Sequence, residues 1–311
     1  MTIDTTRRTI LTGGAALGLA AGLVHSATAE GETPAREFEG KTAFVTGGAR
    51  GIGLGCAEAL AARGANILLF DIATQIPEVP YPLASADDLA AAKTAIEAHG
   101  VQCLAVTGDV RDFDAQKAAM DRAVSELGGL DFIVANAGIT QPGSLEQFSE
   151  EELSLIIDIN LKGVIKTIQA ATPILREQGS GSIVTMASVT GRSGSDRFPV
   201  YSATKWAIIG LTKSAALALG PDGVRVNALC PTLCRTPLLE NDHVLSNMIP
   251  GVTLTWDQFE EVARDIHVLP VGFYGPEYVG SVAAFLCSEA SAMISGDVFD
   301  IGAGANANFP A

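Results

Sequence analysis

The sequence has few charged residues, and positive charge is the scarcer kind. Of its 311 residues, 18% are charged and 48% are hydrophobic, and the formal net charge is −15. An acidic surface repels phosphate backbones, so we do not expect nucleic acid as a partner. The length and the apolar content are sufficient to bury the core of one large α/β domain or two small ones.

Cysteine is too scarce, and too irregularly spaced, for a disulfide framework. The five cysteines are an odd number, and only Cys230 and Cys234 lie close together in the sequence. These two leave open a pair or half of a metal site, but no nearby cluster of His or Cys completes a ligand set. We therefore expect small buried apolar side chains and no metal.

No hydrophobic run is long enough to cross a membrane, but a shorter one lies near the N-terminus. The run Leu11–Val24 follows Arg7 and Arg8 and precedes Ala27-Thr28-Ala29. This order is typical of a secretory signal, and the arginine pair resembles a twin-arginine signal. We therefore expect residues 1–29 to be a signal peptide that directs the protein to the periplasm. The alternative is a cytoplasmic protein with a disordered or helical tail.

From Lys41 onward, short apolar runs alternate with segments of helical periodicity. The apolar runs predict strands over 41–47, 66–71, 101–110, 130–138, 181–188, 223–231 and 296–304. The segments between them predict helices over 51–65, 86–100, 114–128, 151–178, 201–220 and 276–289. Strands that are apolar on both faces and alternate with helices form a covered parallel sheet. The expected fold class is therefore α/β, a three-layer doubly wound parallel sheet of Rossmann type, in a single domain over residues 30–311.

The stretch TGGARGIG, Thr46 to Gly53, joins the first predicted strand to the first predicted helix. Its glycines Gly47, Gly51 and Gly53 allow the backbone to approach a pyrophosphate, which the helix N-terminus stabilises. Asp71 ends the next strand, where a carboxylate can bind both ribose hydroxyls of adenosine and repel a 2′-phosphate. Arg50 could bind that phosphate and is the one feature that favours NADP. Because the carboxylate of Asp71 lies where the phosphate would bind, we expect NAD and keep NADP as the alternative.

Taken in order, these motifs and those further along resemble the short-chain dehydrogenase/reductase family. They are TGGARGIG, Asp109-Val110, ANAG at Ala135 to Gly138, Asn160, Ser188, and YSATK at Tyr201 to Lys205. The resemblance covers roughly Phe38 to Gly304. It implies that Asn160, Ser188, Tyr201 and Lys205 are catalytic. It also implies that the cofactor is bound by Gly47, Arg50, Gly51, Ile52, Gly53, Asp71, Asp109, Val110, Asn136, Ala137, Gly138, Tyr201, Lys205, Pro231, Thr232, Cys234 and Thr236.

A finer resemblance rests on an insertion after Asp71, which runs from Ile72 to about Ser85 with the sequence IATQIPEVPYPLAS. With CPTLCRTPLLEND and LPVGFYGPEYV, it is similar to carveol-dehydrogenase-like enzymes, many of them associated with the redox carrier mycofactocin. This subgroup is thought to hold NAD without free exchange; an ordinary exposed loop is the alternative. Pro231-Thr232 replaces the family's usual Pro-Gly, and Cys234 replaces an aliphatic residue whose backbone would meet the nicotinamide carboxamide.

The chemistry expected of this site is proton transfer coupled to hydride transfer. Tyr201 and Lys205 are four residues apart, so they share one face of a helix. A nearby ammonium favours the phenolate of Tyr201, which can then take the proton of an alcohol. Ser188 can orient the same oxygen, Lys205 can also bind the nicotinamide ribose, and the resemblance implies that Asn160 holds a water in a proton relay.

The interval of about 236–270 is too apolar for a solvated loop, so we expect short helices that form a substrate lid. The sequence does not decide whether Trp256 and Phe259 pack in the core or contact the substrate. An apolar lid favours an apolar secondary alcohol or ketone, such as an alicyclic or terpenoid-like compound. The expected partners are this substrate, a small redox carrier and, by family resemblance, further copies of the chain in a tetramer or dimer. The competing hypothesis is a non-catalytic NAD-binding redox sensor or assembly protein on the same fold.

Overall fold

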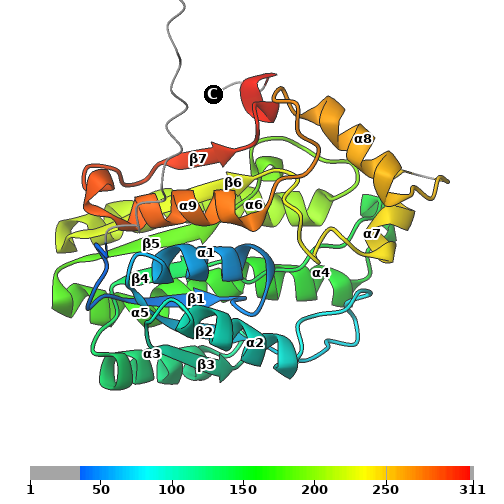
Figure 1. Ribbon diagram of the computed structural model, residues 1–311. Coiled ribbons are helices and arrows are strands. Elements are labelled where there is room, and N and C mark those ends of the chain that lie inside the picture. Colours follow the sequence, from blue (N-terminus) through cyan, green and yellow to red (C-terminus); the bar gives the residue numbers. More distant parts are fainter. Residues whose placement is uncertain (1–35, 250, 309–311) are drawn as a thin grey trace, which may run out of the picture. The chain divides into compact units, whose positions relative to one another are not determined.

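The computed structural model describes residues 36–249 and 251–308, so the predicted signal peptide lies outside the described residues. Within these ranges, seven parallel strands form one sheet in the order β3-β2-β1-β4-β5-β6-β7 (Figure 1). The strands are β1 (Thr42–Thr46), β2 (Asn66–Asp71), β3 (Cys103–Thr107), β4 (Phe132–Ala135), β5 (Gly181–Met186), β6 (Val224–Pro231) and β7 (Val298–Ile301). The predicted doubly wound parallel sheet is confirmed.

Helices connect successive strands and cover both faces of the sheet. They are α1 (Gly51–Ala61), α2 (Ala86–Glu97), α3 (Phe113–Leu127), α4 (Glu150–Ile157), α5 (Val164–Gln178), α6 (Pro199–Leu219), α7 (Asp242–Asn247), α8 (Trp256–Ile266) and α9 (Pro276–Cys287). Short 3₁₀ turns occupy Leu145–Gln147, Val189–Gly191, Gly220–Asp222, Glu289–Ser291 and Ala305–Asn308.

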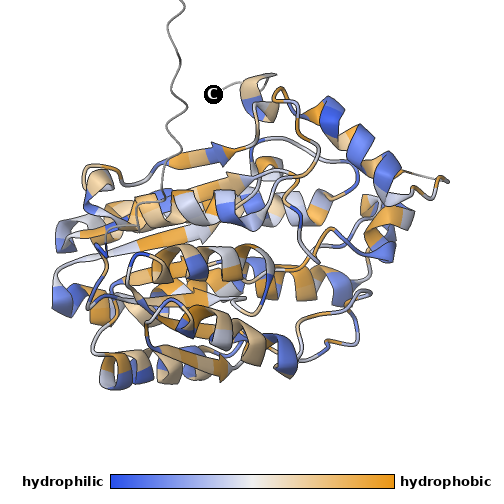
Figure 2. Cartoon of the chain, viewed as in Figure 1, coloured by the Kyte–Doolittle hydropathy of each residue, from blue (hydrophilic) through white to orange (hydrophobic). Residues whose placement is uncertain are grey.

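Two hydrophobic clusters lie on opposite faces of the sheet. On one face, α1, α2 and α9 pack against the strands, with Leu60 and Val279 fully buried. On the other face, α3, α4, α5 and α6 pack around residues such as Met120 and Ile208. Figure 2 accordingly shows the strands mostly apolar and the exposed helices with mixed polarity. Because both faces are covered, the strands read as continuous apolar runs.

The strand order reverses between β1 and β4, and this reversal places the functional site. The chain runs outward from β1 to β2 and β3, and then returns to β4 on the other side of β1. The loops that leave β1 and β4 therefore diverge at their carboxyl ends and leave a crevice between them. The glycine turn follows β1, and the ANAG stretch begins at the last residue of β4.

The predicted helix over 151–178 differs from the structure at its centre. A π turn, Asp158–Gly163, separates α4 from α5. Asn160 lies in this turn, fully buried, and its side-chain amide bonds the backbone of Ile139. A widened turn of this kind is frequent at functional sites, and periodicity alone does not reveal it.

The interval 236–270 contains two helices, α7 and α8, which lie beyond the carboxyl ends of β6 and β7 in Figure 1. Thr255 and Gln258 form a reciprocal capping box that begins α8. Among the helices of residues 36–249 and 251–308, none is both long and apolar enough to span a bilayer.

Candidate active site

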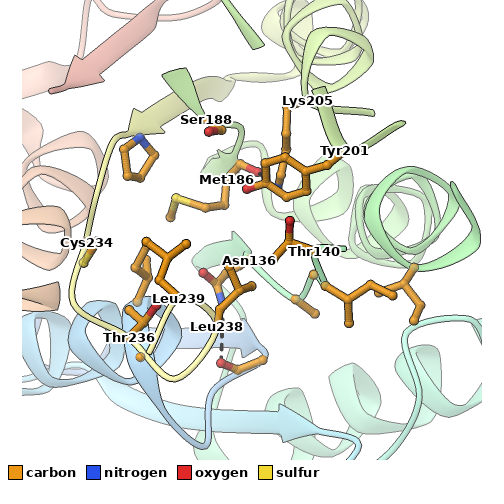
Figure 3. Close-up of a pocket in the computed structure, with 18 of the residues that line it drawn as sticks. Asn136, Thr140, Met186, Ser188, Tyr201, Lys205, Cys234, Thr236, Leu238 and Leu239 are labelled. Carbon is orange, nitrogen blue, oxygen red and sulfur yellow. Dashed lines mark hydrogen bonds between the residues drawn. The ribbon is translucent and has the colours of Figure 1, made fainter. Parts of the chain in front are cut away.

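A cavity of about 580 Å³ lies at the carboxyl ends of the strands, beside the β1/β4 reversal. Figure 3 shows Ser188, Tyr201 and Lys205 on one side of it and Cys234, Thr236, Leu238 and Leu239 on the opposite side. All residues that the sequence predicts for the site line this cavity except Gly53 and Asn160. The structure therefore brings together segments that are widely separated in the sequence.

The turn after β1 has the geometry that its glycines predict. Gly47 and Gly51 have φ angles of +65° and +58°, in the left-handed region that side chains disfavour. Gly53 lies beneath the turn, where an added Cβ would be 2.0 Å from the carbonyl oxygen of Gly47. Gly53 thus allows close packing within the turn, while Gly47 and Gly51 form the cavity wall.

Asp71 lies at the end of β2, buried and fixed by two backbone donors. Its Oδ2 accepts from the Ala49 N–H at 3.0 Å, and its Oδ1 accepts from the Ala73 N–H at 3.1 Å. Each carboxylate oxygen can accept a further hydrogen bond, so the side chain can still bind hydroxyl groups in the cavity. Arg50, the residue that favoured NADP, instead donates to the carbonyl of Pro82 at 2.6 Å.

Asp109 also lines the cavity, but Arg111 is bonded to its carboxylate, with an Nη2–Oδ2 distance of 2.6 Å. Burial acts to raise the pKa of Asp109, whereas the hydrogen bonds and charge of Arg111 outweigh it and hold that pKa below its usual range. Asp109 is therefore ionised at neutral pH. Its predicted contact with adenine stays a prediction.

The insertion folds over the cavity and is held together by one side chain. The Gln75 amide nitrogen donates to the carbonyls of Ile76 and Val79, both at 2.9 Å, and to that of Tyr81 at 3.3 Å. Its amide oxygen accepts from the Leu83 N–H at 3.0 Å. No sequence motif identifies this role, because it depends on the local fold of the loop.

The apolar side chains of the insertion point inward. Val79 and Tyr81 are each 4% exposed and belong to the hydrophobic core. The phenol oxygen of Tyr81 accepts from the backbone N–H of Thr140, at 2.9 Å, in the loop that follows β4. These contacts do not fit an ordinary exposed loop. In Figure 3 the Thr140 hydroxyl points toward Tyr201, a placement that the sequence analysis missed.

Tyr201 and Lys205 lie on the first turns of α6, beside Ser188 at the end of β5. Lys205 is buried, its ammonium donates to the carbonyl of Met186 at 2.7 Å, and its Nζ is 5.3 Å from the centre of the Tyr201 ring. Lys205 is thus close to the phenol without a direct hydrogen bond to it.

Burial dominates the titration of these groups. It raises the pKa of Tyr201 to about 12, although the hydrogen bond with Ser188 acts in the opposite direction. Burial lowers the pKa of Lys205 to about 8, so the ammonium form still prevails at pH 7. In this environment the phenol holds its proton at neutral pH, and a further positive charge in the cavity would favour its release.

Asn160 lies behind the end of β4 rather than in the cavity wall. Its Oδ1 accepts from the Ile139 N–H and its Nδ2 donates to the Ile139 carbonyl, both at 2.8 Å. The side chain thus fixes the loop that carries Gly138 and Thr140. Its role as the ligand of a relay water stays a prediction.

The remaining wall comes from the segment after β6 and from the 236–270 interval. Its larger apolar side chains are Leu233, Leu238, Leu239, Met248 and Ile266. Trp256 and Phe259, left open by the sequence, pack with Phe273 at ring-centre distances of 5.1 to 6.1 Å. They do not line the cavity, so core packing is their role.

The cysteines are structural in the described part of the chain. All five are buried and free, and burial raises the pKa of Cys230 and of Cys234 to about 12. Such thiols are poor nucleophiles at neutral pH. Residues 36–249 and 251–308 contain no group of three or more His, Cys, Asp or Glu that could hold a metal ion.

Comparisons with known proteins agree with this geometry. The family model described as short chain dehydrogenase matches residues 41–244. A (−)-trans-carveol dehydrogenase of Rhodococcus erythropolis is 37% identical over 269 residues, which cover 86% of this chain and 97% of the relative. An uncharacterized oxidoreductase of Mycobacterium tuberculosis is 39% identical over 274 residues, with 86% and 97% covered. The crystal structure of a carveol dehydrogenase from Mycobacterium avium in complex with NAD has a TM-score of 0.84 and 35% identity, and the match covers 88% of this chain and 99% of that one.

Proposed function

The chain belongs to the short-chain dehydrogenase family, and from this premise we propose that it interconverts a secondary alcohol and a ketone with NAD. The observation that carries the proposal is the convergence of Ser188, Tyr201 and Lys205 in one cavity. The chain is thus an oxidoreductase, and its cofactor is NAD.

The residues present fit this cofactor. The left-handed glycines of the turn after β1 line the cavity at the start of α1, where a pyrophosphate would bind to the first backbone N–H groups of the helix. Asp71 would accept from the adenosine ribose hydroxyls and repel a 2′-phosphate. Arg50 is already bonded to Pro82, which weakens the case for NADP.

NAD, when bound, supplies the positively charged nicotinamide ring that accepts a hydride from the alcohol carbon. We propose that Tyr201 acts as the phenolate, which takes the hydroxyl proton of the alcohol so that a ketone and the neutral phenol result, and that the phenol returns this proton in the reverse direction. Ser188 would hold the reacting oxygen by a hydrogen bond. Lys205 would contribute positive charge that favours the phenolate and thus opposes the effect of burial on the pKa of Tyr201.

We propose an apolar substrate, alicyclic or terpenoid-like, bound between Tyr201 and the apolar wall. Met186, Leu238, Leu239, Met248 and Ile266 supply that wall, and the interval 236–270 would act as the lid. Relatives named carveol dehydrogenase support this substrate class. Tetramer or dimer formation stays a prediction from family resemblance.

The direct test is a screen of purified protein with NAD and pairs of alcohols. Each pair contains an alicyclic secondary alcohol and a polar open-chain secondary alcohol, and reduction of NAD is followed by its absorbance. We expect turnover with alicyclic alcohols and at least tenfold lower kcat/KM with their polar counterparts. NAD binding without reduction by any alcohol would instead support the non-catalytic hypothesis.

We also propose that residues 1–29 are a twin-arginine signal and that the protein acts in the periplasm. The support is the sequence Arg7-Arg8, the apolar run and Ala27-Thr28-Ala29, all outside the described residues. Fractionation and N-terminal sequencing of the protein from its native cells test this proposal. A new N-terminus near Glu30 is expected, whereas a cytoplasmic protein that still begins at Met1 would contradict it.

Export of an NAD enzyme raises the question of cofactor supply, because free NAD is scarce outside the cytoplasm. We propose that the chain folds around NAD before transport and that the insertion retains it. The bonds of Gln75 and the contact of Tyr81 with Thr140 support a closed loop. A thousandfold slower release requires about 4 kcal/mol of additional barrier. Bound NAD would then be recycled by a second substrate or a small redox carrier.

A further inference from the structure

A chain of buried hydrogen bonds joins the segment after β6 to the residue that follows α8. The Nε2 atom of His267 lies 2.8 Å from Oγ1 of Thr232, and Nδ1 lies 3.0 Å from the carbonyl oxygen of Val271. His267 is 6% exposed. Because a carbonyl oxygen only accepts, Nδ1 carries a proton and donates to Val271; in the tautomer that is protonated at Nδ1 alone, Nε2 accepts from the Thr232 hydroxyl.

Tyr274 holds the same segment from its other side. Its phenol oxygen accepts from the Thr232 N–H at 2.8 Å and donates to the carbonyl of Ile301. Its backbone accepts from the Arg235 N–H at 2.8 Å and donates to the Leu233 carbonyl at 3.3 Å. The segment Pro231–Arg235 is therefore fixed along its backbone. The hydroxyl of Thr232 lies 2.8 Å from Nε2 of His267 and 3.4 Å from the phenol oxygen of Tyr274, so His267 makes the shorter of its two side-chain bonds.

This link connects two walls of the cavity. Thr232 and Cys234 line the cavity on the segment after β6, and Ile266, the last residue of α8, lines it directly before His267. In Figure 3 Cys234 lies opposite Tyr201 across the cavity.

We propose that His267 is a positioning residue: through Thr232 it fixes the Pro231–Cys234 segment and the end of α8 relative to Tyr201. The inference rests on the proposed function and on the family resemblance, which implies that the backbone at Cys234 meets the nicotinamide carboxamide. A displacement of about 1 Å at the reacting atoms can slow a reaction by about 100-fold. The bond of His267 to Thr232 thus contributes to turnover although neither ring nitrogen touches the reacting atoms.

Two substitutions separate the two bonds of His267. His267→Gln places an amide group near the position of Nε2, so it keeps an acceptor for Thr232 and loses the donor to Val271. His267→Asn places its amide near Nδ1, so it keeps a donor to Val271 and loses the acceptor for Thr232. His99→Asn, at an exposed position after α2, is the matched control.

The experiment measures kcat, the Kd for NAD and the free energy of unfolding of each full-length variant. We expect His267→Asn to lower kcat at least tenfold while the Kd for NAD changes less than threefold, because the adenosine half is bound elsewhere. His267→Gln should recover most of the lost kcat, and His99→Asn should match the unsubstituted protein. Unchanged kcat in His267→Asn, or equal losses of kcat and stability in both His267 variants, would overturn the inference.

Amide hydrogen exchange tests the link independently of any activity. We expect the amides of residues 232–235 to exchange at least tenfold faster in His267→Asn and close to normally in His267→Gln. Equal protection in both variants would overturn the positioning role even if turnover fell. A protein that neither binds NAD nor oxidises any alcohol, yet shows this exchange pattern, would refute the proposed function and leave the link supported.

Discussion

Replacing Gln75 with Ala tests whether the insertion retains the cofactor. The substitution removes the short bonds to the Ile76 and Val79 carbonyls and the acceptor for the Leu83 N–H. A net hydrogen bond contributes about 0.5–1.5 kcal/mol, and the lower half of that range applies because Gln75 is exposed. The three bonds together contribute about 2 kcal/mol to the closed loop, which corresponds to about 30-fold in the rate of opening.

The assay loads purified protein with NAD and follows its release into an excess of competing nucleotide. We expect release about 30-fold faster from Gln75→Ala, and the free energy of unfolding should fall by no more than the about 2 kcal/mol that the three bonds contribute. Gln102→Ala, an exposed glutamine whose side chain makes no hydrogen bond in the structure, is the control. Equal release rates from Gln75→Ala and Gln102→Ala, or NAD lost from the unsubstituted protein on a desalting column, would refute the reasoning.

Two other predictions concern buried charged groups. Asp71→Ala should weaken NAD binding and relax discrimination against NADP. Asp71→Ala should also lower the free energy of unfolding by about 2 kcal/mol, because the N–H groups of Ala49 and Ala73 lose their acceptor. A parent protein that already prefers NADP would contradict the role of Asp71 in cofactor choice. The pKa of Lys205 falls from 10.5 to about 8 on folding, so the unfolded chain binds the proton more tightly and stability rises with pH between about 8 and 10.5. This fall of the pKa corresponds to about 3 kcal/mol at pH 7, and the lost bond to the Met186 carbonyl offsets about 1 kcal/mol of it. Lys205→Met should therefore unfold in urea with about 2 kcal/mol higher free energy than the parent at pH 7, and this gain should shrink toward pH 10. Lower stability of the variant at both pH values would contradict the pKa assignment.

The alternation of strands and helices was predictable because both faces of each strand are covered. Asn66–Asp71, for example, reads NILLFD and is a strand over that full range. The main departure is the turn around Asn160, where a side chain bonds the backbone of Ile139, 21 residues away in the sequence. Periodicity reports the face of a helix that is buried, but it carries no information on such a distant partner.

For the site, the sequence identified residues that occur in ordered motifs and missed those that support them. Ser188, Tyr201, Lys205 and Asp71 follow from motif spacing, and they meet in the cavity. Gln75, Thr140 and His267 were not identified, because a lone polar residue in a loop has no pattern to mark it. The insertion shows both cases, since the sequence marked it as a distinctive segment after Asp71 but gave no sign of the bond between Tyr81 and Thr140.

The measurement that tests the central claim most directly is the turnover of Tyr201→Phe. This variant removes only the oxygen that would transfer the proton and keeps the ring, which packs 6.3 Å from that of Phe198. We predict that kcat falls by about 1,000-fold while the Kd for NAD changes less than threefold. Tyr278→Phe, 58% exposed on α9, should match the parent. Turnover of Tyr201→Phe within tenfold of the parent, with NAD bound normally, would contradict the assignment of Tyr201 as the group that transfers the proton.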